Sequence, residues 1–152
     1  MKLVTFQNNE GAEKIGVLSA SGKTVIPVEE AGLDFNSMQE LICRGSQEDF
    51  RALSKAAGEK EGCPLEDVRM LAPIPSPAQD IICLGINYMD HAEESARFKK
   101  EEFNGERPYA VYFSKRVAKA VADGEPIDGH FDIVDSLDYE AELAVIIGKE
   151  AS

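Results

Sequence analysis

The first thirty residues alternate short apolar runs with polar turns. β-branched and apolar residues gather over residues 2–6, 14–18 and 24–27, and the sequences Asn-Asn-Glu-Gly and Ala-Ser-Gly-Lys separate them. Short runs of this composition, bounded by turn-forming residues, are typical of β-strands. The pattern therefore predicts a small antiparallel meander at the start of the chain.

The hydrophobic period then changes to that of helices. Segments 37–40 and 46–49 each place an acidic residue three positions after a serine, just ahead of apolar residues. This spacing is typical of a capping box at a helix start. We expect two short helices here, ended by Gly45 and Gly58.

Four prolines between residues 64 and 80 interrupt the regular patterns. Proline cannot donate a backbone hydrogen bond and favours an extended conformation in the residue before it. We therefore predict a small N-terminal domain over residues 1–70, a proline-rich linker over residues 71–79, and a second domain from residue 80 to residue 152.

The second domain opens with a continuous apolar run, Ile-Ile-Cys-Leu, over residues 81–84, which predicts a strand buried on both faces. A charged helix is expected to begin within residues 87–91, and strands are expected over residues 110–114, 118–121 and 137–147. The last of these has the composition of a central strand, which needs partners on both edges. Because little sequence follows it, we expect a truncated catalytic domain.

Composition narrows the function classes. The chain has 152 residues, of which 43% are apolar, and its formal net charge is −12. A strongly acidic protein repels nucleic acids and anionic lipids, so neither is an expected partner. No run of signal or membrane-spanning length occurs, and Cys43, Cys63 and Cys83 form no Cys-x-x-Cys pair. These features predict a cytoplasmic protein without a membrane segment.

His91 and Glu94 form the first candidate site. They lie three residues apart in the expected helix and so share one face of it, where the carboxylate could orient the imidazole for proton transfer. The alternative is the solvated start of an ordinary helix.

Glu140 and Glu142 form the second candidate site. Two residues apart in a strand, they would point to the same face. Two buried like charges are costly unless a cation neutralises them, and carboxylate oxygens suit Mg²⁺, Mn²⁺ or Ca²⁺. An edge strand with one wet face is the alternative.

The adjacent bases Lys115 and Arg116 form the third candidate site. They close an apolar strand, where they could bind a substrate carboxylate or simply face solvent. Sequence motifs for serine hydrolysis and for nucleotide binding are absent.

Four segments in this order resemble the fumarylacetoacetate hydrolase family. They are Leu-Ala-Pro-Ile-Pro-Ser-Pro at 71–77, the Gly-x-Asn-Tyr-x-x-His stretch within 82–94, Tyr-Phe-Ser-Lys at 112–115, and Asp-Tyr-Glu-x-Glu-Leu within 137–148. The resemblance implies an α+β, β-rich protein. In it, a small N-terminal αβ domain precedes the beginning of a β-sandwich or β-roll catalytic domain.

The resemblance also implies roles for individual residues. The implied catalytic pair is His91 and Glu94, and the implied ligands of a divalent metal, Mg²⁺ above all, are Glu140 and Glu142. The implied substrate-binding residues are Asn87, Tyr88 and Lys115. Arg116 departs from the family pattern, which often has proline there, and the third metal ligand of the family has no counterpart in this sequence.

The implied activity is metal-dependent hydrolysis of a carbon–carbon bond in a small 1,3-dicarbonyl or 2-oxo acid, of the acylpyruvate or fumarylpyruvate type. Family alternatives are isomerisation of 2-hydroxy-dienedioates and decarboxylation of oxaloacetate. A homodimer is the expected assembly. The remaining alternative is a non-catalytic fragment that needs a partner to complete the site. We also expect the charged stretch 93–107 to order when ligand binds.

Overall fold

The computed structural model describes residues 1–99 and 109–149 of the chain. Two compact units can be distinguished: residues 1–75 together with residues 119–152 form one, and residues 76–118 form the other. The part of the expected ligand-ordered stretch from residue 100 to residue 107 lies outside the described residues. The predicted division at residues 70 and 80 stays a prediction.

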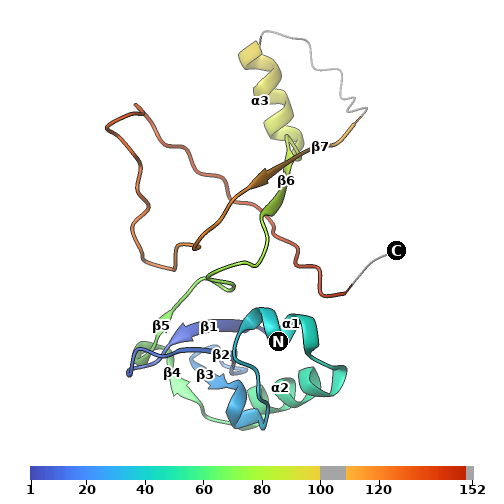
Figure 1. Cartoon of the computed structure of the whole chain (residues 1–152), viewed down its shortest axis with the longest axis vertical. Helices are drawn as coiled ribbons and strands as arrows, with labels where there is room; N and C mark the ends of the chain where they lie inside the picture. The colour runs from blue at the N-terminus through green and yellow to red at the C-terminus, as the bar shows by residue number, and fades with distance from the viewer. Residues whose placement is uncertain (100–108, 150–152) are drawn as a thin grey trace. The chain divides into compact units, whose positions relative to one another are not determined.

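The first unit contains a five-stranded antiparallel sheet in the order β4-β3-β2-β1-β5 (Figure 1). Its three principal strands confirm the predicted meander, because each begins or ends within a residue or two of its predicted run. The strands are β1 (Leu3–Gln7), β2 (Glu13–Leu18), β3 (Thr24–Pro27), β4 (Cys63–Pro64) and β5 (Arg69–Met70).

Two helices follow the third strand, as predicted. They are α1 (Met38–Arg44) and α2 (Gln47–Glu59), flanked by the 3-10 helices η1 (Val28–Ala31) and η2 (Leu65–Asp67). Gly45 ends α1 as expected, but Gly58 lies inside α2, which continues to Glu59. Glycine inside a helix costs only about 1 kcal/mol relative to alanine, so the helix can continue through it.

The serine caps explain where the helices begin. Ser46 and Asp49 form a full capping box, in which the Ser46 hydroxyl accepts from the Asp49 N–H and the Asp49 carboxylate accepts from the Ser46 N–H. Ser37 caps α1 through the N–H of Glu40, whereas the Glu40 carboxylate accepts from the N–H of Asn36. None of the described helices combines the length and apolar character needed to cross a membrane.

The hydrophobic core of this unit lies between the sheet and the helices. Its members come from β2, β3, η1, α1 and α2, which shows that the apolar positions of the meander and of both helices face each other. They are Ile15, Val17, Ile26, Val28, Met38, Leu41, Leu53 and Ala56.

The second unit contains β6 (Ile81–Gly85), α3 (Met89–Lys99) and β7 (Val111–Lys115). The two strands pair antiparallel, and both were predicted. The expected burial of β6 on both faces is wrong: Ile82 is 69% exposed and Leu84 is 41% exposed. The reason is that the described residues give this sheet only two strands, so it lacks the covering layers that bury a strand of a larger sheet.

Two further predicted strands are wrong. Residues 118–119 form a bend, residues 120–121 have no regular structure, and neither does the segment 137–147. A strand exists only where another backbone supplies its ladder of hydrogen bonds, and no described strand pairs with either segment. Every described residue from 131 to 149 is exposed.

Candidate active site

The turn from β6 into α3 carries the centre of the predicted site. β6 ends at Gly85, and Ile86 follows it in a left-handed conformation with φ 51°. A β-branched residue rarely adopts this conformation, which costs about 1–3 kcal/mol and is found most often at functional sites. This conformation could not be predicted from the sequence, because glycine or asparagine is the usual residue at a positive φ.

The predicted substrate-binding residues Asn87 and Tyr88 lie in the same turn, and both are exposed. The carbonyl of Tyr88 accepts a hydrogen bond from the N–H of Ala92 at 3.1 Å, which joins the turn to the first turn of α3. The side chains that follow the strained turn are therefore held by a helix.

His91 and Glu94 both lie on α3, three residues apart and hence on one face, as predicted. His91 is half-buried and Glu94 is exposed. Within the described residues no hydrogen bond joins the two side chains, while the neighbouring Glu93 pairs with Arg97 at 3.5 Å. The helix thus places the pair together without fixing the orientation of the imidazole.

Lys115 lies at the far end of the two-stranded sheet from this turn. It pairs across the sheet with Ile81, whereas Gly85 pairs with Val111. Four residues of an extended strand separate the two ends by about 13 Å. The ammonium of Lys115 lies 5.8 Å from the centroid of the Phe113 ring, a cation–π contact. The structure does not bring Lys115 beside His91.

Glu140 and Glu142 lie in the irregular segment of the first unit, and both are exposed. No group of three or more His, Cys, Asp or Glu side chains among the described residues is arranged to hold a metal ion. The donor chemistry of the two carboxylates nevertheless fits Mg²⁺, which binds through one or two carboxylates and keeps several waters. Their role as ligands stays a prediction.

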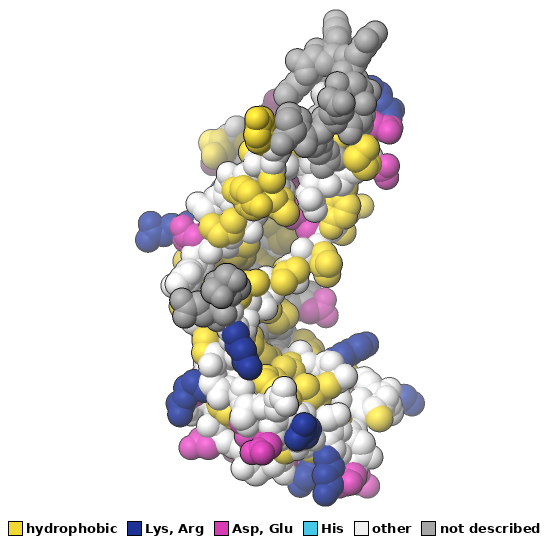
Figure 2. All heavy atoms as spheres, turned by 90° about the vertical axis from the view of Figure 1, so that its right-hand side faces the viewer, with side chains coloured by type: hydrophobic (Ala, Val, Ile, Leu, Met, Phe, Trp, Pro, Cys, Tyr) yellow, Lys and Arg dark blue, Asp and Glu magenta, His cyan; other side chains and the backbone are white. Residues whose placement is uncertain are grey.

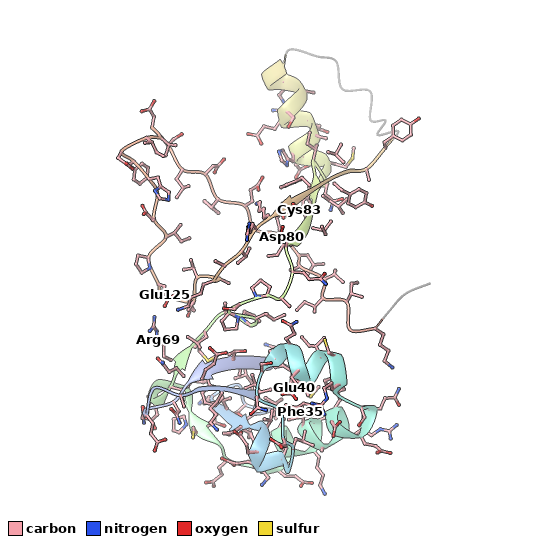
Figure 3. All side chains as sticks on the ribbon, in the orientation of Figure 1. Phe35, Glu40, Arg69, Asp80, Cys83 and Glu125 are labelled. Atoms are coloured by element: carbon pink, nitrogen blue, oxygen red, sulfur yellow. The ribbon has the colours of Figure 1, made fainter. Side chains whose placement is uncertain are left out.

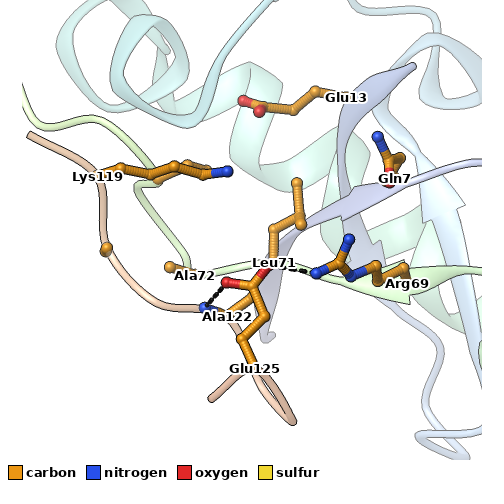
Figure 4. A pocket seen from close by; sticks show the side chains of 10 residues that line it. Gln7, Glu13, Arg69, Leu71, Ala72, Lys119, Ala122 and Glu125 are labelled. Carbon is orange, nitrogen blue, oxygen red and sulfur yellow. Dashed lines mark hydrogen bonds and ion pairs between the residues drawn. The ribbon is translucent and has the colours of Figure 1, made fainter. Parts of the chain in front are cut away.

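Sequence reasoning missed an ion pair within the first unit. Arg69 on β5 pairs with Glu125, which also accepts the N–H of Ala122 at 2.8 Å (Figures 3 and 4). The Ala122 hydrogen bond lowers the pKa of Glu125, and the positive charges of Arg69 and Lys119 lower it further. The partners are 56 residues apart, so no local pattern could have predicted the contact.

This chain is similar to a known protein family and to several known proteins. Some of the alignments cover about half of the chain, and one covers nearly all of it. Residues 80–152 match the family model described as "Fumarylacetoacetate (FAA) hydrolase C-terminal". The chain is 40% identical over 88 residues to the protein named oxaloacetate tautomerase YisK of Bacillus subtilis, an alignment covering 58% of this chain and 28% of that protein.

Two staphylococcal proteins are also similar. An uncharacterised protein of Staphylococcus saprophyticus is 30% identical over 165 aligned positions, which cover 98% of this chain and 52% of that protein. An uncharacterised protein of Staphylococcus aureus is 37% identical over 83 residues, covering 55% of this chain and 25% of that protein. The chain thus spans about half or less of the length of these relatives.

Proposed function

Because residues 80–152 belong to the fumarylacetoacetate hydrolase family, we propose that the chain acts in enolisation chemistry on a small 2-oxo acid. The reaction that we place first is keto–enol interconversion of an oxaloacetate-like acid. The observation that carries this choice is the 40% identity to a protein named oxaloacetate tautomerase.

His91 is the proposed base. A half-buried imidazole at the start of α3 is accessible from solvent, and in its neutral form it can accept a proton from the carbon next to the substrate's carbonyl. The electron pair of that C–H bond forms the carbon–carbon double bond while the carbonyl π pair moves onto the oxygen, and the protonated imidazole then gives its proton to that oxygen. Atoms and charge balance, and no other reactant is required.

Glu94 and Lys115 are the proposed supporting residues. Glu94 shares a helix face with His91, and binding of substrate between them would select the imidazole tautomer able to accept the proton. Lys115, an exposed cation at the end of β7, lies about 13 Å along the strand from the turn before α3, so its proposed role is to attract the anionic acid by its charge rather than to bind it beside His91.

The proposal includes a divalent ion bound by Glu140 and Glu142. Such an ion would polarise the substrate's carbonyl group, which would make the neighbouring C–H bond more acidic. It also supplies positive charge that a chain with net charge −12 needs in order to attract an anionic acid.

Hydrolysis of a carbon–carbon bond is the second candidate function. The description of the matched family names a hydrolase, and cleavage of a 1,3-dicarbonyl acid uses the same polarised carbonyl. Decarboxylation of oxaloacetate and isomerisation of 2-hydroxy-dienedioates are the other reactions of this kind that the site chemistry allows.

Association as a homodimer is part of the proposal. The support is the exposed apolar surface of the β6–β7 sheet, on which Ile82 and Tyr112 are 69% and 67% exposed. Light scattering of the purified chain is expected to give twice the mass of one chain, and a monomer at all concentrations would reject this part.

Product analysis tests the function. The purified chain is incubated with Mg²⁺ and oxaloacetate, and separately with an acylpyruvate, in deuterated buffer. We expect accelerated exchange of the C3 protons of oxaloacetate without release of carbon dioxide, as seen by proton NMR. Cleavage of the acylpyruvate into two acids would favour the hydrolase instead. No conversion of either acid would overturn the enzymatic proposal in favour of a non-catalytic fragment.

A further inference from the structure

A pocket of about 110 Å³ lies wholly within the first unit, between its sheet and the segment 119–125 (Figure 4). One wall is formed by Gln7 with its two cross-strand neighbours, Glu13 on β2 and Arg69 on β5. Residues paired in this way present their side chains on the same face, about 5 Å apart. The three polar side chains therefore form a continuous row at one end of the sheet.

The other wall is tied to the sheet by two contacts. The N–H of Ala120 donates to the carbonyl of Pro75 at 2.7 Å, and Glu125 pairs with Arg69. Lys119, which opens this segment, extends its ammonium toward the pocket from the side opposite Arg69 (Figure 4). The pocket is thus closed by residues far apart in the sequence.

The charges of the lining do not all neutralise one another. Both oxygens of Glu125 are already engaged, one by Arg69 and the other by the N–H of Ala122. Neither Lys119 nor Glu13 has an ion pair with a described residue. One positive and one negative side chain therefore remain open to a ligand.

A hydrogen-bond acceptor remains as well. The amide nitrogen of Gln7 donates to the carbonyl of Gly11 at 2.9 Å, which leaves the amide oxygen of Gln7 able to accept. The rest of the lining is apolar, from Leu71 and Ala72 to Ala122. For comparison, a cavity of about 150 Å³ is large enough for benzene, which has six non-hydrogen atoms, so by the same ratio this pocket of about 110 Å³ holds about four or five.

We propose that this pocket binds a small α-amino acid as a zwitterion. Its carboxylate would pair with Lys119, and its ammonium group would pair with Glu13 and donate to the amide oxygen of Gln7. Glycine, with five non-hydrogen atoms, is the α-amino acid that this volume admits. The site lies outside the residues assigned to the proposed reaction, so it is a second binding site whose failure leaves that reaction untouched.

The probe is glycine, titrated into the full chain while amide chemical shifts are followed by NMR. We expect saturable shifts of the amides of Leu71, Ala120 and Ala122. Lys119→Gln and Glu13→Gln should each weaken binding at least tenfold. Because both side chains are exposed, these variants should keep the native spectrum.

The matched control variants each remove one charge outside the pocket, one positive and one negative. Lys60→Gln and Glu61→Gln change exposed residues after α2, outside this pocket, and should leave the affinity within twofold. Acetate and methylammonium each carry half of the zwitterion and should give no saturable shifts at the same concentrations. The proposal is overturned by the absence of saturable glycine binding, by equal binding of acetate, or by unchanged affinity in either pocket variant.

Discussion

Residues 1–75 and residues 81–147 differ in the solvent exposure of their large hydrophobic side chains, which are mostly buried in the first region and mostly exposed in the second. The first region buries Val17, Leu41 and Leu53 completely. With the exception of Met1, every exposed large hydrophobic side chain among the described residues lies between Ile81 and Ile147. Figure 2 shows such side chains at the molecular surface.

The two regions therefore differ in role: the first contains the hydrophobic core, and the second contains the proposed catalytic residues. The first region has caps, paired strands and a core, and we therefore expect it to give most of the free energy of unfolding. The second region contains the family match and the proposed catalytic residues, yet its described strands pair only with each other. Its stability therefore depends on what else covers it.

The largest expected contrast comes from truncating one aliphatic side chain in each region. Leu53→Ala opens a cavity in the core and should lower the free energy of unfolding by about 3 kcal/mol. Val145 is 76% exposed, so Val145→Ala should lower the free energy of unfolding by less than about 0.5 kcal/mol. Urea denaturation of both variants measures this, and equal losses would contradict the contrast.

Two glycines with positive φ give the next contrast. Gly62 has φ 65°, and a Cβ there would stand 2.4 Å from the carbonyl oxygen of Val25. Gly124 has φ 73°, and a Cβ there would meet nothing within 4 Å. Changing Gly124 to Ala should cost about 1–2 kcal/mol from the backbone alone, and changing Gly62 should cost more. Thermal unfolding of the two variants tests the order, and a reversed order would show that the close approach to β3 is misplaced.

The helix cap of the first region provides a smaller effect. Ser46→Ala removes the hydroxyl that accepts the N–H of Asp49 and should destabilise the chain by about 1 kcal/mol. Ser54→Ala, at an exposed position inside α2, serves as the control and should be neutral or slightly stabilising. The idea fails if circular dichroism during urea unfolding gives the same midpoint for both variants.

The smallest expected effect is a dependence on pH. Hydrogen bonds from the backbone N–H and hydroxyl of Ser46 lower the pKa of Asp49. A carboxyl whose folded-state pKa is lowered stabilises the fold above its unfolded-state pKa, and this contribution is lost as pH falls through the folded-state pKa. Asp49→Asn should therefore flatten the loss of stability below about pH 4. Parallel curves for variant and parent between pH 6 and pH 2 would refute this.

Local signals in the sequence were enough for the first region. The meander and both helix starts follow from alternation, turn residues and serine caps, all of which act within a few residues. Two details were wrong. The helix end expected at Gly58 lies inside α2, and the capping box expected over residues 37–40 is incomplete because the Glu40 carboxylate accepts from Asn36 instead of Ser37.

The second region needed information that local patterns do not contain. Its apolar runs over 118–121 and 137–147 resemble strands, but strand formation depends on a partner distant in the sequence. The sequence motifs did place His91 and Glu94 together on α3. The left-handed Ile86 and the pairing of Arg69 with Glu125 arise from tertiary context and were not predictable.

The central claim is that the second region carries the proton-transfer chemistry through His91, and the chain offers a matched control because it has only two histidines. The measurement is the rate of C3 proton exchange of oxaloacetate with Mg²⁺ for His91→Gln and His130→Gln. We predict that the first variant loses about a hundredfold or more in rate and that the second keeps the parent rate within twofold. Equal rates for the two variants would contradict the claim.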